Sequence, residues 1–564
     1  MEEREVNRRF LFYVTTIVYL IIISFAFRFQ VIEGRKYYRL SETNRIKEVM
    51  IKPPRGQILD RNGKVLATIR PGHEIKVLPA VIDRKTIELL ADIIHKPPSE
   101  ITAKIKECSN PYQAITLGHD IDFVTLCRLE EQLGSLKGVD IVTEPLRYYP
   151  YHRLFFHVVG FVGETSPEEL NKGGYKPGDL IGKTGIEARF ERELKGKKGV
   201  RYIEIDAHGK EIGLVEEKRP IPPQPGMDIK TTLDAELQES TALYLNGYPR
   251  AAVVGMDLRS GEVLILYSKP GIDPNIIVHG MKKNVWDSIS RHPAAPLFNR
   301  TTLSRYPPGS TFKVLTAIAA LISGWDTTRK ISCTKRYRFG NRVFRCWRRH
   351  GRVRFIEAIE KSCDTYFYEI GKTLGLDPLL RVKDLLQFEE KTGIEIEEEE
   401  SFFPDTSWYE RKYGSQWPRG VILNLVIGQG EVLLTPIRLA TIYAEILTGK
   451  KITPHLVKKK RPKSEPLPID NEILKLIHQG LKRVVEEGTG RIVTYYLKDA
   501  GGKTGTAQNP HGEDHSLFIG FTPADNPRFL VCVVIENAGH GASAAAPVAG
   551  KILSLYKKRY VQKT

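Results

Sequence analysis

The sequence predicts an α+β protein with a single N-terminal transmembrane helix, a mostly β pedestal domain and a larger domain. The larger domain is expected to contain an antiparallel sheet with helices on both faces and a helical subdomain. Three observations support this prediction: an uncharged apolar run near the N-terminus, short strand-like segments separated by turn residues, and later strand-like segments that enclose a long helical region. A chain of 564 residues is too long for one ordinary domain. Its hydrophobic content of 41% excludes global disorder.

The apolar run FLFYVTTIVYLIIISFAF (10–27) predicts a membrane anchor at residues 10–28. The run contains no charge, and at about 1.5 Å per residue it nearly crosses a hydrocarbon core of about 30 Å. A cleaved signal peptide would have a shorter apolar region and a small-residue cleavage site, which does not follow this run. Three arginines precede it, so the positive-inside rule predicts that residues 1–9 are cytoplasmic. The protein is therefore expected to be a single-pass protein of the cytoplasmic (inner) membrane, with its bulk outside.

Residues 29–235 are predicted to form the pedestal domain. This region is rich in charge and in turn residues, and RGQILDRNGKVLA (55–67) has the pattern of a strand, a turn and a second strand. The segment KRPIPPQPGMD (218–228) contains four prolines and has the composition of a stiff linker. The domain boundary is therefore placed shortly after it.

Residues 236–564 are predicted to form the second domain. AAVVGMDL (251–258) and EVLILYS (262–268) flank a turn as a hairpin, and SLFIGF (516–521) and RFLVCVVIE (528–536) are strand-like. The region between these pairs is mainly helical. The sheet is therefore expected to be assembled from the two ends of the domain.

The chain is strongly basic, because lysine and arginine exceed aspartate and glutamate by 18. Such an excess indicates either a solvated basic surface or an anionic partner, such as nucleic acid, lipid headgroups or a cell-wall polymer. No zinc-finger, RNP-type or homeodomain signature is present, so no nucleic-acid partner is predicted.

The tripeptide Lys-Thr-Gly occurs twice, in GDLIGKTGIE (178–187) and in GGKTGTAQ (501–508). A phosphate-binding loop would need a glycine five positions before Gly-Lys-Thr, and neither copy has one. The first copy is interpreted as a loop. The second precedes strand-like segments, so Lys503, Thr504 and Gly505 are predicted to lie on an antiparallel strand at the edge of a cleft.

The stretch RYPPGSTFKVLTAIAALI (305–322) predicts an apolar helix that begins at Ser310, after two prolines and a glycine. Lys313 lies three positions later, so its amine is expected over the same helix face as the Ser310 hydroxyl. A helix N-terminus stabilises developing negative charge, and a lysine with a lowered pKa can act as a base. The alternative is an N-cap serine followed by an ordinary helical lysine.

A third motif lies between the Ser310 segment and the second Lys-Thr-Gly. The stretch KSCDTYFYEIG (361–371) puts Ser362 and Asp364 at the start of another helix. The order S-x-x-K, S-x-D and K-T-G resembles that of the penicillin-binding proteins and the serine β-lactamases. The second Lys-Thr-Gly is therefore interpreted as an active-site strand.

The resemblance covers nearly the whole chain and is closest to the class B penicillin-binding proteins. RGQILDRNG, GKTGIEARFERELKGKKG (182–199) and TTLDAELQ (231–238) are similar to their dimerisation-type pedestal. IGQGEVLLTPIRLA (427–440) is similar to their transpeptidase domain. Asp364 stands where most relatives carry asparagine, and together with the sequence CDTYFY it resembles the elongation-type members rather than the division-type members.

The resemblance implies a D,D-transpeptidase that cross-links peptidoglycan stem peptides through a serine acyl-enzyme and is a target of β-lactams. Ser310 would be the nucleophile, Lys313 its base and Ser362 a proton relay. Asp364 and Lys503 complete the implied catalytic set. No cofactor would be required for catalysis.

The same resemblance implies how the substrate is held. The terminal carboxylate of the donor peptide or of a β-lactam would be received by the active-site strand, through Lys503, Thr504, Gly505 and Thr506. The backbone N–H groups of Ser310 and Thr506 would form the oxyanion hole.

Implied partners, besides stem peptides and β-lactams, are a RodA-type SEDS glycosyltransferase and other membrane proteins of the elongation complex. Three alternative functions are a division-specific class B transpeptidase, a β-lactam sensor or β-lactamase, and a non-enzymatic scaffold that activates a SEDS glycosyltransferase. A lactamase would lack the anchor and pedestal. The intact Ser310, Lys313 and Lys503 argue against a pure scaffold.

Cysteine and histidine suggest a metal site beside the S-x-D motif. The residues are Cys333, Cys346, His350 and Cys363, with spacers of twelve, three and twelve residues. A set of three cysteines and one histidine matches structural zinc, although the spacers are longer than those of zinc fingers. Such an ion would hold the S-x-D loop. A Cys333–Cys346 disulfide and buried free thiols are the alternatives.

Overall fold

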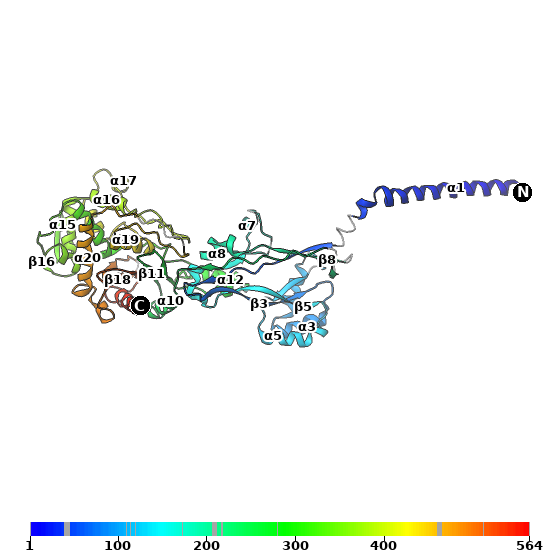
Figure 1. The fold of residues 1–564 in the computed structure, drawn as a ribbon, viewed down its shortest axis with the longest axis horizontal. Helices are drawn as coiled ribbons and strands as arrows, with labels where there is room; N and C mark the ends of the chain where they lie inside the picture. Colours follow the sequence, from blue (N-terminus) through cyan, green and yellow to red (C-terminus); the bar gives the residue numbers. More distant parts are fainter. Residues whose placement is uncertain are drawn as a thin grey trace. The chain divides into compact units, whose positions relative to one another are not determined.

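The structure is a computed structural model that describes residues 2–38, 46–108, 110–112, 114–118, 120–171, 173–176, 178–205, 211–215, 218–278, 280–281, 283–458, 465–510 and 512–562. The chain divides into two compact units, whose elements are labelled in Figure 1. The first unit comprises Met1–Arg55, Arg70–Leu146 and Lys195–Gly226. The second comprises Gly56–Ile69, Arg147–Leu194 and Met227–Thr564. The second unit therefore draws two segments from the part of the chain before residue 227.

The N-terminal apolar run forms helix α1 (Glu2–Phe27), which continues into a π-helical turn, η1 (Arg28–Ile32). Among the described residues, this is the one helix long and apolar enough to cross a membrane. It covers Val6–Ile32, 27 residues whose most apolar window has a mean hydropathy of 2.3. None of that window is buried inside the protein. The predicted helix at residues 10–28 is present and extends farther at both ends.

Beyond α1, the first unit combines strands with the helices α3 (Arg84–Ile93), α4 (Pro98–Lys106) and α5 (Phe123–Gln132). β1 (Ile46–Ile51), β8 (Gly199–Ile205) and β9 (Glu211–Leu214) form an antiparallel sheet in the order β1–β8–β9. The C-terminal part of β3 (Val65–Val77) pairs with β4 (Ile115–Gly118), and β3 also pairs with β5 (Val139–Tyr148). The buried Leu90, Leu117 and Leu129 form part of the common core of these helices.

The second unit contains a five-stranded antiparallel sheet in the order β12–β11–β19–β18–β17. The strands are β11 (Ala251–Asp257), β12 (Val263–Lys269), β17 (Gly501–Ala507), β18 (His515–Thr522) and β19 (Phe529–Ile535). Two strands precede the helical region in sequence and three follow it, as the sequence predicts. Strand β17, which carries the second Lys-Thr-Gly, is at the edge of the sheet.

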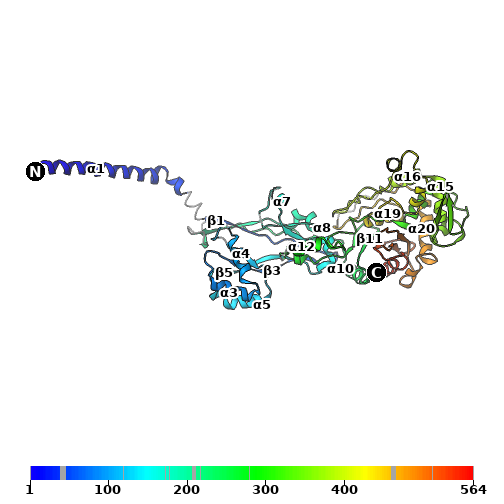
Figure 2. The ribbon, with the colours of Figure 1, turned by 180° about the vertical axis from the view of Figure 1, so that it is seen from behind.

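Helices cover both faces of this sheet. Along β19, Phe529, Val531 and Val533 pack in one cluster with α10 (Ala235–Tyr244) and α21 (Ala545–Tyr560). Leu530 and Cys532 pack in another with α13 (Lys313–Ile322) and α19 (Pro436–Thr448). Figures 1 and 2 both show α10 and α19 on opposite sides of β11. The alternation follows from the two-residue period of a strand, and the predicted fold class is confirmed.

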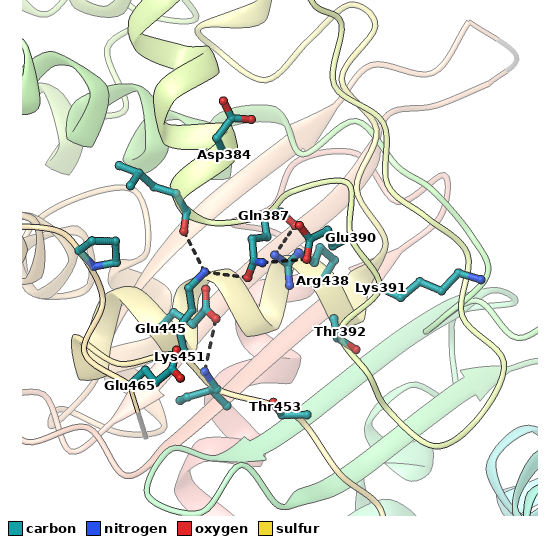
Figure 3. Close-up of a pocket in the computed structure, with 13 residues that line it drawn as sticks. Asp384, Gln387, Glu390, Lys391, Thr392, Arg438, Glu445, Lys451, Thr453 and Glu465 are labelled. Carbon is teal, nitrogen blue, oxygen red and sulfur yellow. Dashed lines mark hydrogen bonds between the residues drawn. The ribbon is translucent and has the colours of Figure 1, made fainter. Parts of the chain in front are cut away.

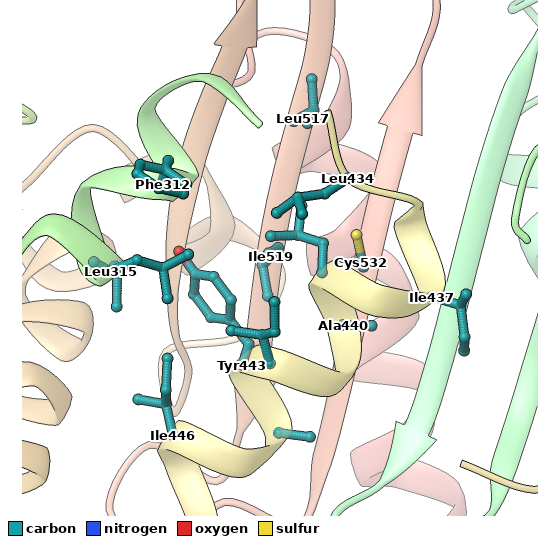
Figure 4. Packing of buried hydrophobic residues seen from close by; sticks show 14 of the residues in the cluster. Phe312, Leu315, Leu434, Ile437, Ala440, Tyr443, Ile446, Leu517, Ile519 and Cys532 are labelled. Atoms are coloured by element: carbon teal, nitrogen blue, oxygen red, sulfur yellow. The ribbon is translucent and has the colours of Figure 1, made fainter. Parts of the chain in front are cut away.

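Helix α19 lies between the sheet and α13, and its apolar side chains contact both (Figure 4). Tyr443, which is fully buried, donates a hydrogen bond from its hydroxyl to the carbonyl oxygen of Thr311 at 2.6 Å. This bond satisfies the buried hydroxyl and ties α19 to the turn that precedes α13.

The remaining helices of the second unit form the helical subdomain and the connections. They include α14 (Phe355–Glu360), α15 (Asp364–Leu374), α16 (Asp377–Leu385), α17 (Thr406–Tyr413), α18 (Gly420–Leu425) and α20 (Asn471–Glu486). Two small hairpin-like pairs, β13 (Ile331–Cys333) with β16 (Gly351–Val353) and β14 (Arg336–Phe339) with β15 (Arg342–Arg345), lie between α13 and α14 in sequence. The first Lys-Thr-Gly joins β7 (Leu180–Gly182) to α8 (Gly185–Arg189).

Candidate active site

Ser310 lies on a 3-10 turn, η4 (Gly309–Phe312), that leads directly into α13. The α-helix therefore begins at Lys313, one turn later than the sequence predicts. Gly309 has φ of +53°, and a Cβ there would lie 2.4 Å from the Thr506 carbonyl oxygen on β17. Only glycine allows this close approach of the turn to the strand. Ser310 is partly exposed, whereas Lys313 is fully buried.

The amine of Lys313 points to the S-x-D motif. Its Nζ donates hydrogen bonds to the Ser362 carbonyl oxygen at 2.8 Å, to Ser362 Oγ at 3.1 Å and to Asp364 Oδ1 at 2.5 Å. Burial raises the pKa of Asp364, and the neighbouring Lys313 opposes that rise. A buried charge is tolerated when it is paired and hydrogen-bonded, as it is here.

Lys503 approaches the same serine from β17. Its Nζ donates to Ser362 Oγ at 3.0 Å and to the Thr504 carbonyl oxygen at 3.1 Å. The side chain is fully buried, and this burial, together with the nearby positive charge of Lys313, holds the pKa of Lys503 well below its usual range. The Ser362 hydroxyl therefore lies between the amines of Lys313 and Lys503.

Ser362 itself occupies an uncommon backbone conformation. It lies between α14 and α15 with φ of +52°, in the left-handed region that non-glycine residues seldom adopt. Such conformations cost of order 1–3 kcal/mol and are concentrated at functional sites. The strain is consistent with the placement of the Ser362 hydroxyl between Lys313 and Lys503.

The outer edge of β17 presents backbone groups to this site. The Thr506 carbonyl oxygen accepts a hydrogen bond from Gln429 Nε2 at 2.9 Å, so it points away from β18. In an antiparallel ladder the N–H and C=O of one residue point to the same side, and the Thr506 N–H therefore faces the same edge. Thr504 is oriented by a 2.7 Å contact between its Oγ1 and that of Thr489. Gly505 has no room for a side chain, because a Cβ would lie 2.9 Å from Thr311 Cγ2.

The structure thus brings together the three motifs that the sequence predicts. Ser362 is hydrogen-bonded to both Lys313 and Lys503, although the three residues come from separate segments. Ser310 lies beside β17 through its neighbour Gly309. Sequence reasoning does not single out Gln429 or Thr489. For Gln429 a signal exists, because it belongs to the stretch IGQGEVLLTPIRLA.

Cys333, Cys346, His350 and Cys363 form one cluster, and one ligand atom from each lies within 4.8 Å of those of the others. His350 Nδ1 is 3.5 Å from both Cys333 Sγ and Cys346 Sγ. The three cysteines are buried and carry free thiols. Hydrogen bonds from Cys363 and His350 lower the pKa of the Cys346 thiol. The sequence prediction that these four residues meet is confirmed.

A cavity of about 450 Å³ contains none of the site residues predicted from the sequence. Its polar lining includes Gln387, Arg438, Glu445 and Lys451 (Figure 3). Lys451 Nζ donates to Leu385 O at 2.8 Å and to Gln387 Oε1 at 3.0 Å. Because neither Ser310 nor Lys313, Ser362 or Lys503 lines it, we assign the cavity no part in the active site.

Two known protein-family domains match this chain. Residues 251–554 match the penicillin binding protein transpeptidase domain, and residues 50–231 match the penicillin-binding protein dimerisation domain. The chain therefore belongs to the penicillin-binding proteins that combine these two domains. The family recognised from the motifs is confirmed.

Within this family the chain is similar to proteins named MrdA or PBP2, and also to stage V sporulation protein D of Bacillus subtilis. The chain is 31% identical to the peptidoglycan D,D-transpeptidase MrdA of Acinetobacter baumannii, over 96% of this chain and 87% of that protein. PBP2 of Helicobacter pylori in complex with MreC matches 91% of this chain and 99% of its own, with 26% identity and a TM-score of 0.81. A chain of a peptidoglycan synthase complex, solved to study coordination of polymerization and crosslinking, matches 97% of this chain and 98% of its own, with 31% identity and a TM-score of 0.72.

Proposed function

We propose that this protein is a peptidoglycan D,D-transpeptidase that cross-links stem peptides during cell elongation through an acyl-enzyme on Ser310. The convergence of Ser362, Lys313 and Lys503 beside the turn that carries Ser310 is the observation that supports this proposal most directly. The similarity to MrdA proteins supports the reaction, and the similarity to PBP2 structures supports the elongation role. Incubation with a β-lactam followed by peptide mass spectrometry tests it, and the expected result is an adduct on Ser310.

The reaction begins when the Ser310 hydroxyl attacks the carbonyl carbon of the penultimate D-alanine. Lys313 takes the hydroxyl proton as Oγ bonds to carbon, and as the C–N bond breaks the terminal D-alanine leaves with that proton on its nitrogen. Ser362 relays that proton, because its Oγ is within hydrogen-bond distance of both lysine amines, at 3.1 and 3.0 Å. The hydrogen bond that Lys503 donates to Ser362 Oγ holds that hydroxyl in place for the relay. An acceptor amine from a neighbouring strand then attacks the ester and regenerates Ser310.

The edge of β17 holds the donor peptide. Lys503, Thr504, Gly505 and Thr506 receive its terminal carboxylate, and the Ser310 and Thr506 N–H groups stabilise the oxyanion. The outward direction of the Thr506 backbone, set by its bond from Gln429, supports the second of these roles. Preorganised donors of this kind are worth about 3–4 kcal/mol in a comparable hydrolase.

The close contact between the turn and the strand predicts that Gly309→Ala lowers the rate of β-lactam acylation by about a hundredfold, because a displacement of about 1 Å can have that effect. The new Cβ would lie 2.4 Å from the Thr506 carbonyl oxygen and would push Ser310 away from β17. The acylation rate, measured with a fluorescent penicillin, checks the prediction.

Gly324→Ala is the matched control for this variant, because Gly324 also has positive φ, +75°, but a Cβ there meets nothing within 4 Å. Its acylation rate should stay near that of the parent protein. Equal loss in the two variants would mean that backbone strain, and not the contact with Thr506, causes the defect.

We infer that Cys333, Cys346, His350 and Cys363 hold a structural Zn²⁺ and that catalysis itself requires no cofactor. The donor set fits, because three thiol sulfurs and an imidazole nitrogen are already gathered within 4.8 Å of one another. Zinc sites with this ligand set are usually closed and tetrahedral. Bound zinc would hold the loop that carries Ser362 and Asp364 against the segment that carries the other three ligands.

The membrane anchor and the rest of the first unit connect the protein to the other members of the elongation complex. Residues 1–9 lie in the cytoplasm, and the chain that follows the anchor lies outside the cytoplasmic membrane. The partners are a RodA-type SEDS glycosyltransferase and other membrane proteins of the elongation complex. The similarity to a PBP2 solved with MreC and to a chain of a peptidoglycan synthase complex supports these roles.

Exposed apolar residues of the first unit offer a test of this coupling. Phe123 and Val124, at the start of α5, are 77% and 59% exposed. Replacement of both by serine should lower the stimulation of the partner glycosyltransferase severalfold and leave β-lactam acylation of Ser310 unchanged. The control is Tyr495→Ser in the second unit, because Tyr495 is also a large apolar side chain and is 83% exposed. If the double variant polymerises glycan with its partner as well as the parent does, α5 takes no part in coupling.

A further inference from the structure

The segment between α13 and α14 carries an unusual concentration of positive charge. Residues 327–356 contain nine arginines, two lysines and no aspartate or glutamate. All eleven of these basic residues are exposed. Among the described residues, Arg329 is the one member of the set in an ion pair, with Glu369 at 3.1 Å. We call residues 329–354 the arginine segment. In the described part of the chain, the other ten charges of this segment face solvent without an ion-paired acid.

The strand pairing places like charges opposite each other. Arg336 on β14 is directly opposite Arg345 on β15, and Arg338 is opposite Val343. Like charges at directly opposed positions of an antiparallel pair destabilise the sheet. The other face of this pair is the packed one, because the rings of Tyr337 and Phe344 lie 5.6 and 5.4 Å from that of Tyr368. The Arg336–Arg345 pair therefore contributes nothing favourable to the hairpin by its charge, and both side chains are free to face solvent.

The arginine segment is attached directly to the active site. The Trp347 backbone N–H donates to Asp364 Oδ2 at 3.2 Å, and the other oxygen of Asp364 accepts from Lys313. The Trp347 indole Nε1 donates to the Lys361 carbonyl oxygen at 3.1 Å. With its nitrogen held in this way, the Trp347 ring is still 53% exposed. It presents an aromatic face between Arg345 and Arg348 in sequence.

We propose that the arginine segment binds the glycan strand before cross-linking, through carboxylates on its stem peptides, and so delivers stem peptides to the site. This inference rests on the proposed transpeptidase function and names a docking surface for its polymeric substrate. A strand that has not been cross-linked carries a free terminal carboxylate on each stem peptide, so it is a polyanion with regularly spaced charges. Arginine suits such a partner because its guanidinium binds carboxylates in a bidentate geometry. Trp347 supplies an apolar face for a sugar ring.

The test compares two triple variants of the full-length protein in detergent. Arg336→Ser, Arg338→Ser and Arg345→Ser remove charge from the arginine segment. Lys104→Ser, Lys106→Ser and Arg128→Ser remove the same charge from exposed positions of the first unit. Binding of a fluorescent, uncross-linked glycan strand is measured by anisotropy at low and at high salt. The first variant should bind the glycan strand about ten- to a hundredfold more weakly than the parent protein does. Its binding should also depend much less on salt concentration than the binding of the parent protein does.

Acylation by a small β-lactam reports whether the variants are folded, and a second set with glutamine in place of the three arginines guards against local misfolding. Unchanged strand binding by folded arginine variants would overturn the inference and leave the proposed function intact. Equal weakening in the control variant would overturn it too, since net charge alone would then explain binding. A loss of binding to phosphatidylglycerol vesicles or single-stranded DNA, with strand binding retained, would assign the surface to another partner and reject the inference. Failure of the parent protein to be acylated at Ser310 would instead contradict the proposed function.

Discussion

Ser310→Ala is expected to abolish covalent labelling by β-lactams and the cross-linking of stem peptides, while the fold stays intact. The hydroxyl is the proposed nucleophile, and loss of a serine nucleophile lowers turnover roughly a millionfold in a comparable hydrolase. Ser310 is partly exposed on the turn η4, so the loss of one oxygen leaves no core cavity. Mass spectrometry of penicillin-treated protein, together with a cross-linking assay on polymerised glycan, measures both effects.

Two further variants sharpen this experiment. Ser323→Ala removes an exposed hydroxyl at the other end of α13 and should be labelled like the parent protein. Ser362→Ala should still be labelled on Ser310, but more slowly, because the bridge between Lys313 and Lys503 is lost. Penicillin found on Ser362 in the parent protein, or no adduct on folded protein, would contradict the assignment.

Removal of the metal is expected to have the second largest effect. Purified protein should contain roughly one zinc per chain, as a closed tetrahedral site requires. Cys346→Ala should eliminate it, lower the melting temperature by at least about 5 °C and slow acylation, since metal binding to such sites contributes directly to folding. The acylation effect follows because Cys363 is adjacent to both Ser362 and Asp364. Elemental analysis, thermal unfolding and acylation kinetics measure the three quantities.

Cys127→Ala is the matched control for the metal, because Cys127 is exposed and lies outside the cluster. It should keep the zinc and the melting temperature. A disulfide between Cys333 and Cys346 would give a metal-free protein with a mass about two daltons below the reduced value, as expected for one S–S bond joining two thiols. A metal-free protein with the reduced mass would leave only buried thiols.

The sequence by itself determined the features that depend on neighbouring residues or on local composition. The apolar run indicated α1, and the short strand-like segments on either side of the helical region indicated the sheet. The order of the three motifs indicated the family, and the spacing of Cys333, Cys346, His350 and Cys363 indicated that the four could share a site. These signals are local, because backbone sterics, side-chain periodicity and motif chemistry act over a few positions.

Tertiary structure alone decided how the motifs meet. Lys313 and Lys503 lie far apart in sequence, and only the packing of α13, α15 and β17 places both amines on Ser362. The lowered pKa of Lys503 depends on complete burial near a second lysine. Burial is a property of the assembled core, because it depends on which distant segments exclude water. For the same reason the role of Gln429 and the attachment of Trp347 to Asp364 became visible only in the folded chain.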